Sequence, residues 1–199
     1  MAAQAPERGG EVRRRLLEAA ALLIGERGWT AVSTRVLAER AGVAPGLVHY
    51  HFHSLPALLR EAAITAMRGV LAEAAPPRPG PGGAPDVLDA FLSVLDRYSG
   101  DDPGSLLFIE AYLAATRDGE LRAELAGLLA QVRDALAARL AEAGQAEPET
   151  TASVLAAALD GLFLHRALNP ELTAAAVGPV LRRLITTDGG AEAPEGEPA

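Results

Sequence analysis

Residues 33–52 read STRVLAERAGVAPGLVHYHF, and this stretch decides the fold of the chain. Ser33 is placed to cap a first helix, because its hydroxyl can accept a hydrogen bond from the free backbone amides of the opening turn. Gly42 can adopt the left-handed conformation that ends a helix, and Pro45 is tolerated in the first turn of the next one. The stretch therefore predicts a helix-turn-helix, in which the second of two short helices is presented to the major groove of DNA.

Apolar residues at helical spacing continue along the chain and predict an all-α fold. The other expected helices span residues 11–28, 55–75, 86–99, 103–116, 120–143, 149–168 and 173–187. Gly178-Pro179 should kink the last of them or move its start. We expect a flexible N-terminus at 1–10, a three-helix helix-turn-helix head at 11–70, a helical-bundle body for ligand binding and dimerisation at 71–187 with a loop at 76–85, and a disordered acidic tail at 188–199.

The composition of the 199 residues excludes several classes of protein. Cysteine is absent, which rules out disulfides, thiol redox chemistry and cysteine-ligated zinc. No apolar run is long enough to span a bilayer, and the N-terminus lacks the apolar core of a signal peptide. We therefore expect a soluble cytoplasmic protein without a membrane partner.

The net charge of −8 is unevenly distributed along the chain. Residues 1–60 hold eight Arg against five acidic residues, a balance of +3, whereas residues 61–199 hold ten Arg against twenty-one, a balance of −11. A mildly basic head on an acidic body can bind DNA with one face while the rest of the molecule repels it.

The helix-turn-helix resembles that of the TetR/AcrR family of transcriptional regulators through Thr34, Leu37-Ala38, Ala41-Gly42-Val43, Gly46, Val48, Tyr50-His51-Phe52 and Leu58. The resemblance implies a homodimer that inserts the third helix of each head into a double-stranded DNA operator and dimerises through its two C-terminal helices. It also implies a repressor that leaves DNA when a small-molecule inducer of unknown identity binds in the body. The family usually has a lysine where this chain has Leu55, which removes one phosphate contact and should reduce the salt dependence by about one unit.

The resemblance places the DNA contacts at Thr34, Arg35, Ala44, Pro45, Gly46, Leu47, His49, Tyr50 and His51. The turn from Ala44 to Leu47 faces the base edges and offers little hydrogen bonding, so we expect readout through thymine methyl groups and DNA shape. Arg35, His49, Tyr50 and His51 are expected to contact phosphates and sugars.

The body contains residues suited to an apolar ligand pocket, namely Phe91, Leu107, Phe108, Glu110, Tyr112 and Phe163. The same residues also fit a plain helix-bundle core. Glu110 lies in an apolar helix, and a buried carboxylate needs a partner, which could be Arg166 or a ligand.

Other activities find little support in the sequence. His49, His51 and His53 point about 200° apart in turn along a helix, so they do not converge on a metal ion. No phosphate loop, nucleophile elbow or paired-carboxylate motif is present, and we expect neither an enzyme nor a cofactor. Two alternatives stay open. One is a helical ligand-binding or protein-interaction bundle whose helix-turn-helix no longer binds a specific operator, and the other is a helical enzyme with its site in the body.

Overall fold

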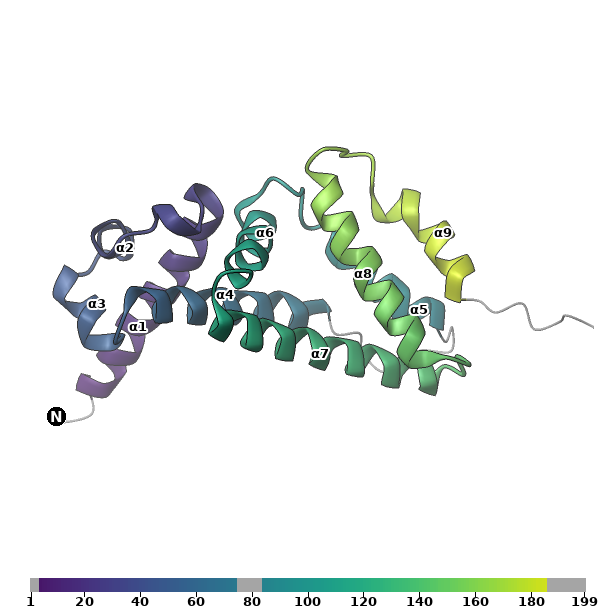
Figure 1. The fold of residues 1–199 in the computed structure, drawn as a ribbon, viewed down its shortest axis with the longest axis horizontal. Coiled ribbons are helices and arrows are strands. Elements are labelled where there is room, and N and C mark those ends of the chain that lie inside the picture. Colours follow the sequence, from purple (N-terminus) through teal and green to yellow (C-terminus); the bar gives the residue numbers. More distant parts are fainter. Residues whose placement is uncertain (1–3, 75–83, 186–199) are drawn as a thin grey trace, which may run out of the picture.

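The computed structural model describes residues 4–74 and 84–185, and within these ranges the regular structure is entirely helical (Figure 1). The all-α prediction is therefore confirmed. The elements are α1 (Gln4–Arg27), the short 3₁₀ helix η1 (Trp29–Ala31), α2 (Thr34–Ala41), α3 (Pro45–His51), α4 (Leu55–Ala74), α5 (Ala84–Leu95), α6 (Pro103–Ala115), α7 (Gly119–Glu142), α8 (Pro148–Arg166) and α9 (Ala174–Ile185). None of the helices in the described part is long and apolar enough to cross a membrane.

The helix-turn-helix is formed by α2 and α3, and its local signals act as the sequence predicts. The Ser33 hydroxyl accepts a hydrogen bond from the Val36 N–H at 3.4 Å. Gly42 has a φ of +64° and ends α2 in the left-handed conformation. The Arg15 guanidinium of α1 donates to the carbonyls of Ala41 and Gly42, which fastens the turn to the first helix.

The molecule is elongated, with α1–α3 at one end and α8 and α9 at the other (Figure 1). Long helices α4 and α7 run between the two ends, and α6 packs against α1 in the middle of the molecule. The position of α6 matters for function, because this one helix contacts both the head and α8.

Buried apolar side chains form two clusters, and these do not follow the expected domain boundary. The first joins α1–α4 with α6 and the first half of α7, including Leu107 and Leu125. The second joins α5, the second half of α7, α8 and α9, including Leu136 and Leu155. The head therefore shares a core with part of the body, while the division into domains at residues 70 and 71 stays a prediction.

Several helix ends differ from the predicted ones. The first helix begins at Gln4, within the segment that we expected to be flexible. Helix α5 begins at Ala84 with Pro85 in its first turn, where the missing N–H of proline costs no hydrogen bond. Helix α9 begins at Ala174 and continues through Pro179, so Pro179 does not delay its start. Most of the expected loop at 76–85 and all of the acidic tail at 188–199 lie outside the described residues.

Candidate nucleic-acid interface

The outer surface of α3 is built from side chains that the core does not use. Val48 and Phe52 are buried and anchor the helix to the head. Tyr50 is 80% exposed, and its ring meets the edge of His51 with 5.0 Å between the ring centroids. His49 is also exposed. Tyr50 and His49 are therefore free to meet a partner without any change in the fold.

The remaining residues of the predicted interface surround this surface. Ala44, Pro45 and Gly46 are exposed at the start of α3, Leu47 and His51 are half-buried, and on α2 Thr34 is half-buried and Arg35 exposed. Within residues 4–74 and 84–185, Arg35 forms no hydrogen bond or ion pair, so its charge is available to a phosphate. The structure thus brings the predicted residues together on one end of the molecule, and their contacts with DNA stay a prediction.

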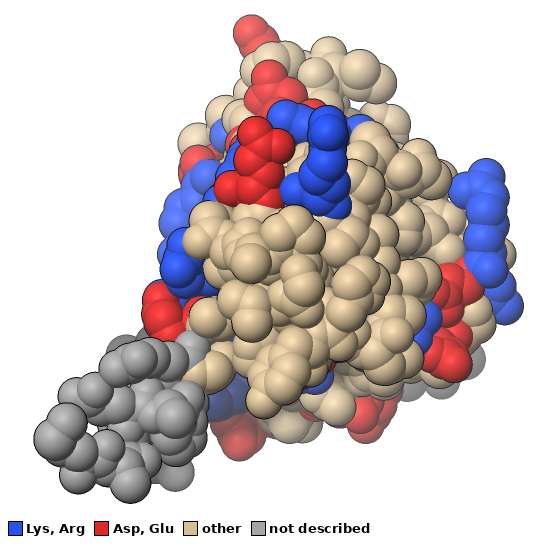
Figure 2. Space-filling model, turned by 90° about the vertical axis from the view of Figure 1, so that its left-hand side faces the viewer, with Lys and Arg blue, Asp and Glu red and all other residues tan. Residues whose placement is uncertain are grey.

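The free positive charge of the head is smaller than its sequence suggests. Arg13 pairs with Glu61 at 2.5 Å, and Arg40 makes two hydrogen bonds to Glu26 at 2.9 and 2.5 Å. Figure 2 shows the end of the molecule that carries α2 and α3, with a broad uncharged centre and both signs of charge around it. The described surface of the head therefore offers a phosphate fewer unpaired Arg side chains than the sequence alone suggests.

Leu55, which stands where the family usually has a lysine, is the first residue of α4. Its side chain is half-buried and packs against the core of the head, while the Ser54 hydroxyl caps the helix by accepting from the Ala57 N–H at 3.2 Å. The position adds apolar packing to the head instead of a charge near the DNA backbone.

Of the six residues expected to line a pocket, the five whose side chains the structure describes lie in different surroundings. Leu107 is buried in the core shared with the head. The Glu110 carboxylate accepts a hydrogen bond from the backbone N–H of Trp29 at 2.7 Å, so its partner within the described chain is this backbone group and not Arg166. Arg166 instead bonds the Leu95 carbonyl and pairs with Asp96 at 3.2 Å. The side chain of Phe91 lies outside those that the structure describes.

The other three residues meet at the seam between α6 and α8. The rings of Phe108 and Phe163 are parallel, with centroids 6.3 Å apart. One turn further along α6, the Tyr112 hydroxyl donates to the Asp160 carboxylate at 2.9 Å. Burial raises the pKa of both groups, and the negative charge of Asp160 raises the pKa of Tyr112 further. This seam combines aromatic surface with a carboxylate in the manner of a ligand site.

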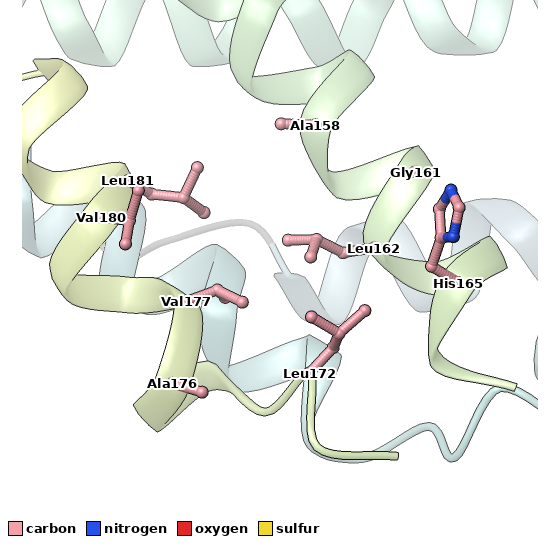
Figure 3. A pocket seen from close by; sticks show the side chains of 9 residues that line it. All are labelled: Ala158, Gly161, Leu162, His165, Leu172, Ala176, Val177, Val180 and Leu181. Atoms are coloured by element: carbon pink, nitrogen blue, oxygen red, sulfur yellow. The ribbon is translucent and has the colours of Figure 1, made fainter. Parts of the chain in front are cut away.

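An apolar groove between α8 and α9 was not predicted as a pocket. Its volume is about 520 Å³, and Figure 3 shows the residues that line it, which come from α8, from α9 and, for Leu172, from the segment between them: Ala158, Gly161, Leu162, His165, Leu172, Ala176, Val177, Val180 and Leu181. Larger apolar side chains are exposed near it, with Leu168 at 87% and Val180 at 50%. Small residues recur along α8 and permit close approach of another helix, but they do not all face the groove: Gly161 lines it, whereas Ala152 is fully buried within the chain.

An exposed short helix held by a capped helix-turn-helix defines a DNA-binding protein of the helix-turn-helix class. Comparison with known proteins gives the family. Residues 16–62 match the model of the tetR family of bacterial regulatory proteins, and residues 82–187 match that of the tetracyclin repressor-like C-terminal domain. The chain belongs to the TetR family of transcriptional regulators, which are DNA-binding proteins and not enzymes.

Individual relatives agree with this assignment. The chain is 30% identical to the HTH-type transcriptional regulator BetI of Rhizobium meliloti (strain 1021), over 78% of each chain. It is 30% identical to SCO7518 of Streptomyces coelicolor A3(2), covering 89% of this chain and 99% of that one with a TM-score of 0.73. It is also similar to the multidrug binding protein EbrR crystallised with malachite green, at 31% identity and a TM-score of 0.67, covering 87% of this chain and 98% of EbrR.

Proposed function

We propose that this chain is a homodimeric, ligand-responsive repressor that acts in the cytoplasm and leaves its operator when a small molecule binds in the body. The observation that carries the proposal is the double attachment of α6, which is bonded to the head through Glu110 and to α8 through Tyr112. A ligand that displaces α6 therefore also pulls on the head, and a ligand with different affinity for the two arrangements shifts their populations.

The ligand site that we propose is the α6–α8 seam around Phe108, Tyr112 and Phe163. These side chains are partly accessible and offer aromatic surface beside a hydrogen-bonded carboxylate. EbrR, which shares the fold, was crystallised with malachite green, an aromatic molecule. Malachite green is thus a reasonable first probe for this chain.

The dimer that we propose is formed by α8 and α9. The groove between them is apolar and open, and an exposed apolar surface of this kind on a soluble regulator indicates a protein partner. A second copy of the chain would complete a four-helix bundle about a two-fold axis. Dimerisation also gives the two recognition helices that operator half-sites about 34–36 Å apart require.

The test uses fluorescence anisotropy of labelled DNA from beside the chain's own gene, titrated with protein with and without malachite green. We expect selective binding by two chains per site and release of the DNA by the dye. Binding that the dye leaves unchanged would remove this dye as an inducer, and ligands of other chemistry would then be screened in the same assay. Weak and unselective binding would contradict the proposal that the chain has a specific operator.

A second function has one observation in its favour. The uncharged centre of the head and the apolar Leu55 fit a bundle whose head has lost its specific operator (Figure 2). The titration distinguishes the two functions, because this alternative predicts no preference for any DNA sequence.

A further inference from the structure

We propose that Glu110 is a positioning residue for DNA binding, which fixes the angle of each head on the body and thereby sets the operator half-site spacing that the dimer accepts. The inference rests on the homodimer proposed above. It concerns a residue outside the helix-turn-helix that does not touch DNA.

Glu110 satisfies a backbone group that has no partner within its own helix. Trp29 opens η1 directly after α1 ends, and its N–H donates to Glu110 Oε2 at 2.7 Å. Both carboxylate oxygens lie 3.6 Å from the position that a Cβ on Gly28 would occupy, and Gly28 has a φ of +85°. The carboxylate therefore lies directly against the turn. Its hydrogen bond to Trp29 is of the stronger kind, because a charged acceptor binds an N–H more strongly than a neutral one does.

This turn is the point from which the helix-turn-helix leaves α1. Trp29 and the Ser33 cap of α2 are separated only by Thr30, Ala31 and the buried Val32. A shift of the turn therefore moves the start of α2, and α3 follows because only the short turn from Gly42 to Ala44 joins the two helices.

Two separate contacts with α6 are needed to fix an angle, and the structure provides them. At the start of α6, the backbone of Pro103 packs so closely on Gly25 that a Cβ there would collide with the Pro103 carbonyl. Two turns later, Glu110 holds Trp29. Apolar packing of α1 on α6 also resists rotation of the head, and Glu110 adds to it a hydrogen bond of fixed direction, two turns away from the Pro103 contact.

On its other side, α6 contacts α8, which is one of the two helices of the proposed dimer interface. Tyr112 stands two residues after Glu110 and donates to Asp160 on α8, next to the apolar groove that Gly161 lines. Helix α6 thus fixes the angle between the head and α8, because it is bonded to both. Because each base pair of spacing changes the separation of half-sites by about 3.4 Å, a head that pivots would accept neighbouring spacings.

The first experiment measures spacing discrimination. A DNA site is selected from a random pool with the wild-type chain, and variants with one base pair added or removed between the half-sites are compared by anisotropy. The spacing ratio is the affinity for the selected site divided by the affinity for a site with altered spacing. Glu110→Ala should lower this ratio about tenfold, because a lost hydrogen bond to a charged group has an effect of this size. Glu110→Gln keeps an acceptor oxygen and should retain the ratio. Glu124→Ala removes an exposed carboxylate on α7 and serves as the control.

The second experiment reads the geometry without DNA. The chain has no cysteine, so Glu39→Cys on the exposed face of α2 allows one spin label per head. Pulsed dipolar spectroscopy then gives the distances between the two heads of a dimer. The distribution should broaden in Glu110→Ala and stay narrow in Glu110→Gln.

The outcomes separate this inference from the function on which it rests. An unchanged spacing ratio and distance distribution in Glu110→Ala would overturn the role of Glu110 alone. Equal weakening at all spacings, with loss of the native Trp29 fluorescence, would show that Glu110 holds the head folded and would also overturn it. No dipolar signal from the wild-type chain would refute the proposed dimer, and the inference with it.

Discussion

The two ends of the molecule present surfaces of opposite character. At the head, the surface of α3 exposes Tyr50 and His49, which carry groups that water or phosphate can bond. At the other end, Val180 of α9 and Leu168, just after α8, are exposed, and the groove between the two helices is almost wholly apolar. Water can satisfy the exposed groups of α3, whereas the α8–α9 face gains free energy when it is covered. The comparison supports the two proposed partners, DNA at one end and a second copy of the chain at the other.

The largest expected effect comes from placing a charge in the apolar groove between α8 and α9, where a second chain is proposed to bind. A Cβ on Gly161 would meet no atom within 4 Å, so Gly161→Glu should not disturb the protomer. In a dimer the carboxylate would be buried without a partner, and we expect the dimer dissociation constant to rise about 100-fold or more. Sedimentation equilibrium measures this constant.

A matched control exists on α7. Gly127 is also helical, exposed and without neighbours for a Cβ, so Gly127→Glu makes the same change away from the groove. It should leave the dimer intact. A Gly161→Glu protein that remains as dimeric as the control would place the interface elsewhere.

At the head, Tyr50→Ala should weaken DNA binding about tenfold and leave the dimer unchanged. Tyr50 is 80% exposed, so its removal costs little folding free energy, while a lost phosphate or sugar contact costs about 1–2 kcal/mol. Anisotropy measures the affinity, and Tyr50→Phe separates the hydroxyl from the ring. Unchanged affinity in Tyr50→Ala would remove this residue from the interface.

The junction between head and body gives a smaller effect that depends on pH. Hydrogen bonds from the Leu121 N–H and from Arg60, each at 3.0–3.1 Å, hold the pKa of Asp118 below its usual value. The stabilisation is therefore present above the ordinary carboxyl pKa of about 4 and is lost as the pH falls through the lower folded value. Asp118→Ala should cost about 1 kcal/mol at neutral pH, the usual value of a helix cap.

Chemical denaturation at several pH values tests this prediction. The free energies of unfolding of wild type and Asp118→Ala should converge in strong acid. The control is Asp134→Ala, at an exposed position on the same helix, which should track the wild type throughout. A difference between wild type and Asp118→Ala that persists in acid would mean that packing, and not the charge, accounts for it.

The smallest expected effect concerns DNA affinity and is produced at Leu55. Leu55→Lys restores the charge that the family usually has, and its aliphatic stem can still cover part of the core. One added phosphate contact should raise the affinity about threefold and steepen the salt dependence by about one unit, with the same preferred sequence. Ala72→Lys, at an exposed position near the far end of α4, adds the same charge and should change neither. An unchanged affinity and salt dependence in Leu55→Lys would show that the start of α4 faces away from the DNA backbone, and a loss of affinity would show that the packing of Leu55 on the head is needed.

Features that depend only on neighbouring residues could be predicted from the sequence. The cap at Ser33, the turn at Gly42 and the start of α3 at Pro45 are decided within a few positions, and each was predicted. Prediction was weaker where the cause lies far along the chain. The partner of Glu110 is a backbone N–H more than eighty positions away, which no periodicity reveals.

The groove and the start of α5 show the same limit. Small residues recur along α8, but only the fold shows that Gly161 faces the open side while Ala152 is covered by the chain itself. Proline and glycine before Asp86 predicted a loop up to residue 85, whereas Pro85 is tolerated in the first turn of α5. Helix ends depend on such alternatives, and a pattern alone does not decide between them.

The most direct test of the central claim, a dimeric TetR-family regulator with its own operator, is binding to DNA from beside the gene at about 50 and about 200 mM salt. The account predicts two chains per site, a marked preference over unrelated DNA of equal length, and an affinity that falls as salt rises. Equal, weak binding to both DNAs at both salt concentrations would contradict it.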